Sequence, residues 1–576
     1  MMVDGGSNLR RFFADLHKDI TLAEANATVE KLTNLPAFFA SEAELGAFLA
    51  SAASGSDVSL VAPKCGRQWG DFQTPLGLAE EVCRYVASIG CNPAAIVEPT
   101  CGEANFIKAA LRQFPSAVSI YGVEIQPAHV STLKLWLLEH ALAHGRFHAR
   151  IAVHQDDIFL HKFAVPHEGE ILILGNPPWV TNAELATLDS LNLPVKANFK
   201  GHSGLDAMTG KSNFDISESI VLRLLEVFHG RRGALALLCK NSVIRNLMQE
   251  LPRRRFRAAE IKALGIDAKK HFGAAVEASL LLVRLGAEVP EATCSTYPDI
   301  AANQKAATFG WAGDRFVADV DAYETSRDLD GRCPLVWRQG IKHDCAKVME
   351  LRESDRAYVN GLGEVAELEH EAIYPLLKSS DLKGFATGGA RFRIPITQRK
   401  IGEDTDGIAQ RLPKLWAYLE GHRAIFDGRK SSIYRGKPPY SIFGIGAYSF
   451  APYKVAISGM YKTGCFTLVE PIGGKPVMLD DTCYFLGFDS YTEALLVCSA
   501  LNSPLVRCFL NSLVFRDAKR PYTKDLLMRI DLRQVFRRLA YQDLEEVWSR
   551  FDYHPADRQT VKAALAARQS GVEGWA

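Results

Sequence analysis

The chain has almost no excess of charge of either sign. Its 576 residues include 67 basic and 66 acidic side chains, which gives a net charge of +1 at pH 7. The total charge therefore does not predict a polyanionic partner, although a basic patch on one face of the protein is compatible with it. The hydrophobic content of 47% and the charged content of 23% are those of a soluble globular protein.

Long apolar runs and paired cysteines are also missing. No apolar run reaches the roughly 18 residues that a membrane span needs, and the first residues, "MMVDGGSNLRRFFADLHKDI", lack the apolar core of a secretory signal. The 12 cysteines include no C-x-x-C pair, which speaks against a zinc site or a disulfide framework. We therefore expect a cytoplasmic protein with reduced thiols, no membrane partner and no metal.

The chain has no internal repeat and no low-complexity tract, and its length predicts about three to four units. Residues 21–35 and 41–53 each begin with a Thr or Ser that can cap a helix. Glycine and proline recur every few residues in the last third, which favours loops over helices. We expect a helical segment over 1–64, an α/β domain over 65–290, a connecting region over 291–345 and a mixed α+β domain over 346–576.

Between about residues 80 and 290, apolar runs typical of strands alternate with helical stretches. The runs are "AAIVEPT", "SIYGVEI", "ARIAVHQDD", "EILILGNPP", "GALALLCK", "EIKALGI" and "ASLLLVRL". This alternation predicts βαβ units and a Rossmann-like, mostly parallel sheet with helices on both faces. The fold class is therefore α/β.

The first three of these runs end in residues that suit a nucleoside ligand. Glu98, Pro99 and Gly102 follow the first run, Glu124 ends the second and Asp157 follows the third. A glycine in a strand-to-helix turn lets a ligand approach the backbone, and an acid at the next strand end suits ribose hydroxyls. The pattern lacks G-x-G-x-x-G, and acidic Glu98 would repel a pyrophosphate but attract an amino group. It favours S-adenosylmethionine over NAD.

The fourth run continues into the most informative stretch, "ILILGNPPWV" over residues 171–180. Prolines end a strand and stiffen the residue before them, so Asn176 is expected to sit rigidly at the ligand-binding edge of the sheet. The Asn176 side-chain oxygen and the Pro177 carbonyl can accept both hydrogens of an exocyclic amine, with Pro178 holding the turn and Trp179 stacking on the base. The alternative is a tight turn with an aromatic plug.

In these motifs the chain resembles the gamma-class N6-adenine DNA methyltransferases of bacterial restriction–modification systems. "DFQTPLGLAEEVCRYV" resembles the amino-terminal cofactor motif of that class, and "VEPTCGEANF" resembles its D/E-P-x-C-G-x-G-x-F motif. Ala104 stands where the family usually has glycine. The resemblance implies S-adenosylmethionine as cofactor, bound by Phe72, Thr74, Pro75, Glu98, Pro99, Gly102, Phe106, Glu124, Ile125, Asp157, Ile158 and Asn176.

The resemblance also implies how the target base is held. N-P-P-[YFW] marks the transfer site, and "HFGAAVEASLLLVRL" resembles a later motif that places an aromatic, here Phe272, on the flipped base. Phe214 is implied near the same pocket by "GKSNFDISESIVLRLLEVF". The catalytic set is therefore Asn176, Pro177, Pro178, Trp179 and Phe272. A core phenylalanine is the alternative for Phe272.

The partner implied is double-stranded DNA, whose target base must be flipped into the enzyme. The region over 346–576 would then be a target recognition domain that contacts phosphates and base edges. Arg429, Lys430, Tyr434, Arg435 and Lys437 are its candidate DNA contacts, although a basic loop is also common as a solvated surface. A restriction nuclease is expected as a separate chain.

Three other functions stay open at this point. An N-P-P-[YW] turn also serves methyltransferases that act on RNA bases or on protein glutamine. An inactive homologue that only binds DNA would keep the same fold. The amine at N4 of cytosine suits the same pair of acceptors as N6 of adenine.

Overall fold

The computed structural model describes residues 6–16, 19–54, 72–166, 168–180, 215–254, 256–355, 357–556 and 558–570. The chain divides into two compact units, Met1–Phe316 and Val317–Ala576. The division differs from the expected boundaries at residues 290 and 346. Strands after residue 290 pair with the sheet of the first unit, so the expected connecting region is shared between the two units.

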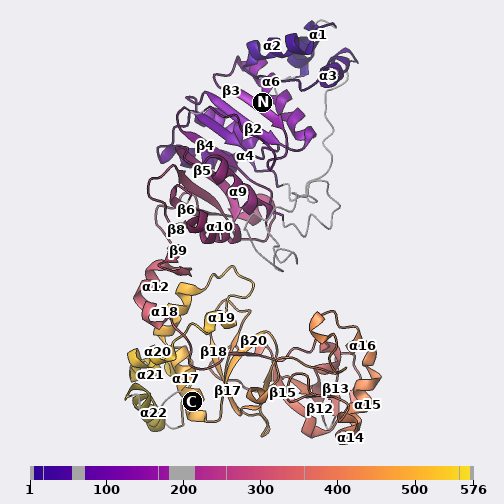
Figure 1. Ribbon diagram of the computed structural model, residues 1–576, viewed down its shortest axis with the longest axis vertical. Coiled ribbons are helices and arrows are strands. Elements are labelled where there is room, and N and C mark those ends of the chain that lie inside the picture. The colour runs from indigo at the N-terminus through magenta and orange to yellow at the C-terminus, as the bar shows by residue number, and fades with distance from the viewer. Residues whose placement is uncertain are drawn as a thin grey trace. The chain divides into compact units, whose positions relative to one another are not determined.

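The first unit is built around one large sheet (Figure 1). Its strands are β1 (Ala95–Glu98), β2 (Ser119–Glu124), β3 (Arg150–Gln155), β4 (Ile171–Gly175), β5 (Gly233–Lys240), β6 (Ala258–Ile266), β7 (Ala278–Leu285), β8 (Thr293–Tyr297), β9 (Ala307–Ala312) and β10 (Arg315–Val317). They lie in the order β10-β9-β8-β6-β7-β5-β4-β1-β2-β3. The five neighbouring strands β3, β2, β1, β4 and β5 are parallel to one another. Strand β7 lies between β5 and β6 and runs antiparallel to both. The predicted α/β fold with a mostly parallel sheet is confirmed.

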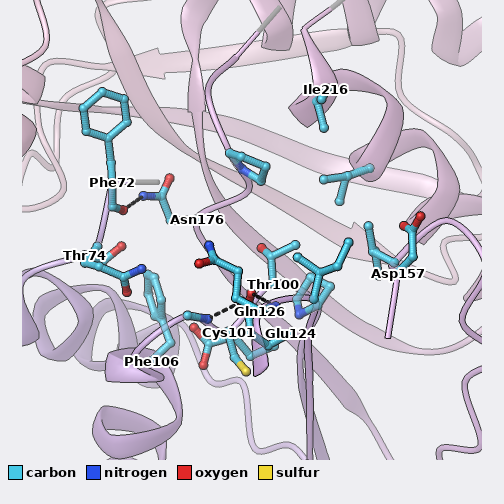
Figure 2. Close-up of a pocket in the computed structure, with 18 of the residues that line it drawn as sticks. Phe72, Thr74, Thr100, Cys101, Phe106, Glu124, Gln126, Asp157, Asn176 and Ile216 are labelled. Carbon is cyan, nitrogen blue, oxygen red and sulfur yellow. Dashed lines mark hydrogen bonds between the residues drawn. The ribbon is translucent and has the colours of Figure 1, made fainter. Parts of the chain in front are cut away.

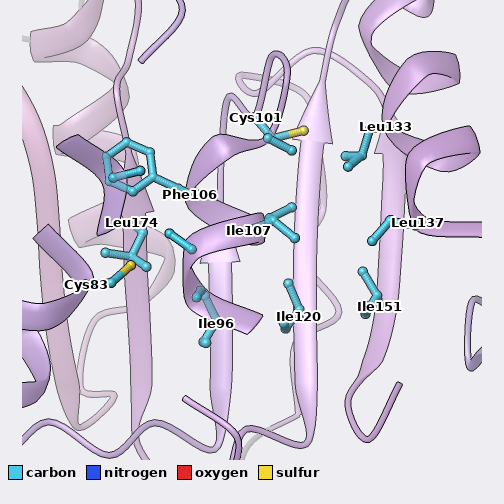
Figure 3. Packing of buried hydrophobic residues seen from close by; sticks show 14 of the residues in the cluster. Cys83, Ile96, Cys101, Phe106, Ile107, Ile120, Leu133, Leu137, Ile151 and Leu174 are labelled. Atoms are coloured by element: carbon cyan, nitrogen blue, oxygen red, sulfur yellow. The ribbon is translucent and has the colours of Figure 1, made fainter. Parts of the chain in front are cut away.

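The sheet is buried on both faces, as its continuous apolar strands require. One face is covered by α4 (Leu76–Ser88), α5 (Asn105–Gln113) and α6 (Pro127–His144). Figure 3 shows Ile96, Ile120 and Ile151, from three neighbouring strands, in this layer. Each of them is at most 1% exposed, and burial of such a side chain stabilises a fold by about 1.5–3 kcal/mol. Helix α10 (Asn241–Arg254) contacts β5, β7 and β9 and packs on α9 (Ile216–Val227).

The helices expected near the start of the chain belong to the first unit. They are α1 (Gly6–Asp15), α2 (Leu22–Thr33) and α3 (Glu42–Ser54). Thr21 caps α2 in a capping box with Glu24, as its position before the helix predicts. Phe38, Phe39 and Phe48 join the same core as the sheet, and α1 and α2 contact α6. These helices therefore extend the core of the α/β unit beside β3.

The second unit mixes small sheets with helices, in agreement with the expected α+β class. Its strands form three sheets of order β11-β20-β17-β18, β12-β13-β14 and β16-β15-β19. The strands are β11 (Arg338–Gln339), β12 (Arg352–Ser354), β13 (Ala357–Val359), β14 (Val365–Ala366), β15 (Ile373–Leu377), β16 (Phe392–Pro395), β17 (Tyr453–Ser458), β18 (Phe466–Val469), β19 (Met478–Leu479) and β20 (Cys483–Phe488).

Helices of the second unit lie mostly toward its carboxyl end. They are α12 (Val320–Ser326), α13 (Ala346–Met349), α14 (Ile408–Arg411), α15 (Pro413–Gly421), α16 (Arg423–Asp427), α17 (Tyr491–Leu501), α18 (Pro504–Leu513), α19 (Lys524–Leu527), α20 (Leu532–Arg538), α21 (Tyr541–Arg550) and α22 (Arg558–Ser570). Among the described residues no single helix is long and apolar enough to cross a membrane, although the bent pair α17 and α18 passes that test together.

Candidate functional site

A cavity of about 260 Å³ lies at the carboxyl ends of the parallel strands (Figure 2). Its lining includes the residues predicted for the cofactor: Phe72, Thr74, Glu98, Pro99, Gly102, Phe106, Glu124, Ile125, Asp157, Ile158 and Asn176. Pro178 also lines it. Pro75, Pro177, Trp179 and Phe272 are described residues that lie outside its lining. The folded chain thus brings segments that begin at residues 72, 98, 124, 156 and 176 to one place.

The turn after β1 is tied to the end of β2 through a buried carboxylate. The main-chain N–H of Gly102 donates to Glu124 Oε2 at 2.8 Å, and the N–H of Gln126 donates to Glu124 Oε1 at 2.8 Å. Gly102 has φ +48, and a Cβ there would lie 2.6 Å from Oε1 of Gln73. Glycine adopts this backbone conformation without strain, and a side chain there would displace the Gln73 amide. Two amides hold the Glu124 carboxylate at the rim of the cavity.

Ala104, where the family pattern has glycine, adopts a glycine-like backbone. Its φ of 58 and ψ of 37 place it in the left-handed region, immediately before α5. This conformation costs an L-residue about 1–2 kcal/mol. Ala104 therefore carries backbone strain that a glycine at this position would not have.

Glu98 is the most deeply buried acid of the cavity, with 3% of its surface exposed. Its Oε2 accepts the main-chain N–H of Ile107 at 3.1 Å. Burial raises the pKa of the Glu98 carboxyl well above its usual value, the Ile107 hydrogen bond opposes this, and the nearby Glu124 carboxylate adds to it. A cationic ligand group in the cavity would favour the ionised form, so the site suits a positively charged amino group.

The loop after β3 forms the opposite end of the cavity. Asp157 Oδ1 accepts the N–H of Phe159 at 2.9 Å, which fixes the carboxylate on its own loop. Ile158 is 7% exposed, whereas Ile125 on the facing strand end is 38% exposed. Apolar side chains on two sides with a carboxylate beside them make a slot for a flat polar ring.

An arginine on α9 holds this loop in place. Arg223 Nε donates to the carbonyl of Ile158 at 2.7 Å, and its second terminal nitrogen donates to the carbonyl of His161 at 2.8 Å. The imidazole of His161 is in turn bonded to Asp156 Oδ2 at 2.7 Å and to the Tyr121 hydroxyl at 2.9 Å. The loop that forms the slot is therefore held in place by Arg223, which lies far from it in the sequence.

The Asn176 amide is oriented by a segment far away in the sequence. Its Nδ2 donates to the main-chain carbonyl of Phe72 at 3.0 Å, as Figure 2 shows. Its Oδ1 is buried and has no hydrogen-bond partner among the described residues. A buried acceptor without a partner is uncommon in folded proteins and calls for an explanation such as a ligand.

The rest of the N-P-P-W turn is held by β5 and α9. Lys240 Nζ donates to the Trp179 carbonyl at 3.4 Å and forms an ion pair with Asp215. The Val180 carbonyl accepts the N–H of Ile216 at 2.9 Å. These contacts fix the turn on both sides, in line with a rigid acceptor site.

The structure gives Trp179 an environment that differs from the expected stacking face. Its side chain is 6% exposed, and its indole N–H donates to the Leu238 carbonyl at 3.3 Å. The Trp179 ring lies 5.1 Å from Phe272 and 6.0 Å from Phe72, and those two rings are 6.1 Å apart. Phe72 and Phe272 are only half-buried. Trp179 therefore supports the two phenylalanines, which present the more accessible ring faces.

Several cavity residues are absent from the predicted set, although Asn105 belongs to the strand-end motif "VEPTCGEANF". Asn105 Nδ2 donates to the Thr74 carbonyl at 2.8 Å, and the Glu103 N–H donates to Gln73 Oε1 at 2.8 Å. These bonds join the two cofactor motifs, and the place of Gln73 between Phe72 and Thr74 was a local signal for its role. Cys101 stands at a defined position of the D/E-P-x-C-G-x-G-x-F motif. Nothing local marks the others: Thr100, Gln126, Asp156, Phe159, Val180, Ile216 and Ile220. Phe214 lies outside the described residues.

The predicted DNA contacts in the second unit divide into two groups. Lys430, Arg435 and Lys437 are exposed. Arg429 instead donates to the carbonyls of Ser441 and Pro439, both at 2.7 Å, and of Phe426 at 3.0 Å. Its guanidinium also lies 3.7 Å from the centroid of the half-buried Tyr434 ring. The Arg429 guanidinium and the Tyr434 ring hold the loop together, although the buried Tyr434 hydroxyl has no hydrogen-bond partner among the described residues.

Several known proteins are similar to this chain. No family model matches the chain. The type II methyltransferase M.NspV of Nostoc sp. is 40% identical over 469 residues, which are 81% of this chain and 96% of the relative. The solved structure of the type IIL restriction–modification enzyme MmeI in complex with DNA has a TM-score of 0.49, with 13% identity over 86% of this chain and 72% of that one. The type IIG restriction endonuclease BpuSI has a TM-score of 0.33, with 11% identity over 92% of this chain and 68% of that one.

The chain belongs to the family of type II methyltransferases, the modification enzymes of restriction–modification systems. Its identity to M.NspV extends over nearly the whole relative, so membership covers both units. The predictions of a restriction–modification methyltransferase and of S-adenosylmethionine as its methyl donor are confirmed. The family does not by itself define which base accepts the methyl group.

Proposed function

We propose that the protein transfers a methyl group from S-adenosylmethionine to N6 of an adenine that is flipped out of duplex DNA. One observation carries the proposal. Asn176 Oδ1 is buried without a partner among the described residues, while Nδ2 of the same amide is held by the Phe72 carbonyl. The amide therefore offers an oriented hydrogen-bond acceptor that the folded chain itself does not use.

An exocyclic amine needs such an acceptor because its lone pair is delocalised into the ring. Hydrogen bonds from the amine to Asn176 Oδ1 and to the Pro177 carbonyl favour the developing positive charge on nitrogen. The acceptors are preorganised, since Lys240 and Ile216 hold the turn that carries them. The amine proton then leaves after methyl transfer, so no general base has to act before attack.

The cofactor is assigned to the cavity by the chemistry of its two ends. Bound S-adenosylmethionine supplies a methyl group that is already activated by a sulfonium. Glu98 would face its amino group, Glu124 its ribose hydroxyls, and Asp157 with Ile158 its adenine. The buried Glu98 carboxyl fits a cationic partner, which would restore the ionised form that burial disfavours.

Duplex DNA is the proposed substrate, and the second unit is the proposed target recognition domain. A base inside a duplex must be extruded before it reaches the Asn176 acceptor. Phe72 and Phe272 are placed to contact the extruded ring, because they are half-buried and pack on Trp179. The modification would protect DNA from a nuclease carried on a separate chain.

Nucleoside analysis after methylation tests the proposal. The full chain is incubated with labelled S-adenosylmethionine and duplex DNA, RNA or a bacterial protein extract, and the DNA is digested to nucleosides. Label in N6-methyl-2′-deoxyadenosine from the DNA is the expected result. Label in N4-methyl-2′-deoxycytidine would contradict the adenine assignment, and label in RNA or protein with unlabelled DNA would contradict the substrate class.

A further inference from the structure

A second strongly basic surface lies in a part of the second unit that the sequence motifs do not mark. It comprises Arg507 on α18, Arg516, Lys519 and Arg520 in the following loop, and Lys524 at the start of α19. All five residues are exposed. We call them the 507–524 basic surface.

The cations of this surface are not used within the fold. None of the five side chains forms an ion pair or a hydrogen bond with a described residue, unlike the arginines that follow in the chain. Arg529 pairs with Asp330 at 2.6 Å, Arg533 with Asp531 at 2.9 Å, and Arg538 with Asp328 at 2.5 Å. In a chain with a net charge of +1, five unpaired cations within 18 residues leave a local excess of positive charge.

The basic surface also places like charges near each other. Burial lowers the pKa of the Arg550 guanidinium, and the positive charge of the nearby Arg507 lowers it further. The Arg550 guanidinium donates to the Asn502 carbonyl at 3.0 Å, so it is held in place beside this repulsion. An anion bound at the surface would relieve it.

The loop that carries the cations is anchored, which reduces the entropy lost on binding. Tyr522 is 1% exposed. Its hydroxyl oxygen packs so closely on Gly464 that a Cβ added to that glycine would lie only 2.5 Å from the oxygen. A Cβ on Gly459 would be 3.2 Å from the Tyr522 carbonyl. Tyr522 thus packs the basic loop tightly onto the neighbouring loop 459–465.

The neighbouring loop adds groups that suit nucleic acid. Lys462 is exposed, and Tyr461 is half-buried. The N–H groups of Met460 and Tyr461 donate to Ser458 Oγ at 3.2 and 3.3 Å, which fixes the start of the loop. An aromatic ring beside exposed cations is a common combination in nucleic-acid contacts.

We propose that the 507–524 basic surface binds the phosphate backbone of the duplex DNA that the enzyme methylates. The assignment rests on the proposed DNA substrate. The cations are spread along a loop and the two helices that flank it, so they suit a polyanion with spaced charges better than a small anion. Release of counterions from the duplex would supply the binding free energy.

Salt-dependent binding of the full chain tests this surface. The variant carries Arg516→Ala, Lys519→Ala, Arg520→Ala and Lys524→Ala, and binding to a labelled duplex that the parent methylates is measured between 50 and 200 mM salt. If each cation contacts one phosphate, the slope of log K against log salt should fall by about 2 to 4. Affinity should fall at least about tenfold at the lower salt concentrations.

The matched control carries Arg558→Ala and Lys562→Ala on α22. These exposed cations belong to the same unit, but they lie over the rings of Trp548 and Tyr541 at 6.0 and 5.4 Å. The control should keep the parent's slope, and both variants should keep the parent's S-adenosylmethionine affinity by calorimetry and its unfolding temperature. An unchanged slope in the folded four-site variant, or an equal loss in the control, would overturn the surface assignment. A parent that binds and methylates no duplex DNA would overturn the proposed function itself.

Discussion

The side chain of Asn176 donates from Nδ2 to the main-chain carbonyl of Phe72, across 104 residues of sequence, at 3.0 Å. This bond joins the proposed transfer site to the first cofactor motif. It also orients the amide so that Oδ1 faces away from the Phe72 carbonyl. The methyl donor site and the acceptor for the amine are therefore connected by one hydrogen bond.

Asn176→Ala should slow methyl transfer far more than it weakens binding. The change removes an acceptor that matters most as the amine becomes positively charged, and loss of one preorganised group typically lowers the rate by about 10² or more. Single-turnover rates should fall by that amount, while calorimetry and DNA binding give values near those of the parent. Transfer at the parent rate would contradict the role given to the N-P-P-W turn.

Phe272→Ala and Trp179→Ala should fail in different ways. Phe272 is half-buried, so its loss should remove stacking of about 1–3 kcal/mol and lower the signal of a fluorescent adenine analogue at the target position. Trp179 is 6% exposed and sits in the core, so its loss should cost about 3–5 kcal/mol of folding free energy. Thermal unfolding and analogue fluorescence separate the two effects. A Trp179→Ala protein as stable as the parent would show that its ring is not a core support.

Glu98→Gln should stabilise the cofactor-free protein near neutral pH and weaken cofactor binding. The folded-state pKa of Glu98 is raised, so its favourable contribution is complete below the unfolded pKa and is lost as pH rises through the folded pKa. Scanning calorimetry should therefore show a variant advantage at pH 8 that shrinks at pH 5. S-adenosylmethionine affinity should fall about tenfold or more, since a hydrogen bond to a charged group is worth about 1.5–3 kcal/mol. If the stability gain of Glu98→Gln over the parent were the same at both pH values, ionisation of Glu98 would not be its cause.

Arg223→Met should raise the KM for S-adenosylmethionine with little change in kcat. Arg223 positions the loop that carries Asp157 by donating to Ile158 and His161, so its loss removes binding that is equal in the ground and transition states. A rise in KM of about tenfold is expected for Arg223→Met, and a smaller rise in KM is expected for Arg223→Lys. Arg231→Met is the matched control, because Arg231 also donates to a carbonyl, that of Pro166 at 2.8 Å, away from the cavity. A fall in kcat at constant KM would contradict a positioning role.

Lys454→Met should stabilise the second unit at neutral pH. Lys454 is 1% exposed, its Nζ donates to the Ala451 carbonyl at 2.6 Å, and burial lowers its pKa to about 7. The unfolded chain therefore binds more protons than the folded chain from about pH 7 up to the ordinary lysine pKa, and parent stability rises with pH across that window, by up to about 1.4 kcal/mol per pH unit. Urea unfolding at pH 7.5 and 9.5 measures this. The advantage of the variant should be smaller at pH 9.5, and an equal advantage at both values would rule out titration of Lys454.

Local patterns were sufficient for the elements of the catalytic unit. The seven apolar runs are β1 to β7, because a strand that is buried on both faces of a sheet needs a continuous apolar segment, and proline or glycine ends it. The strand-end residues Glu98, Glu124, Asp157 and Asn176 line one cavity, because parallel strands bring their carboxyl ends to one edge. These results follow from spacing and residue type alone.

The contacts that orient the site were decided by tertiary structure. Sequence spacing cannot show that Arg223 reaches Ile158, that Phe72 holds Asn176, or that Ile216 and Ile220 close the cavity, since each depends on how α9 and the first cofactor motif pack on the sheet. Trp179 was expected to stack on the base, but in the folded chain it is buried and supports the core. Arg429 was expected to contact DNA, but its guanidinium donates to main-chain carbonyls. A residue type states which interactions a side chain is able to make, whereas only the packed chain decides which of its partners are already taken.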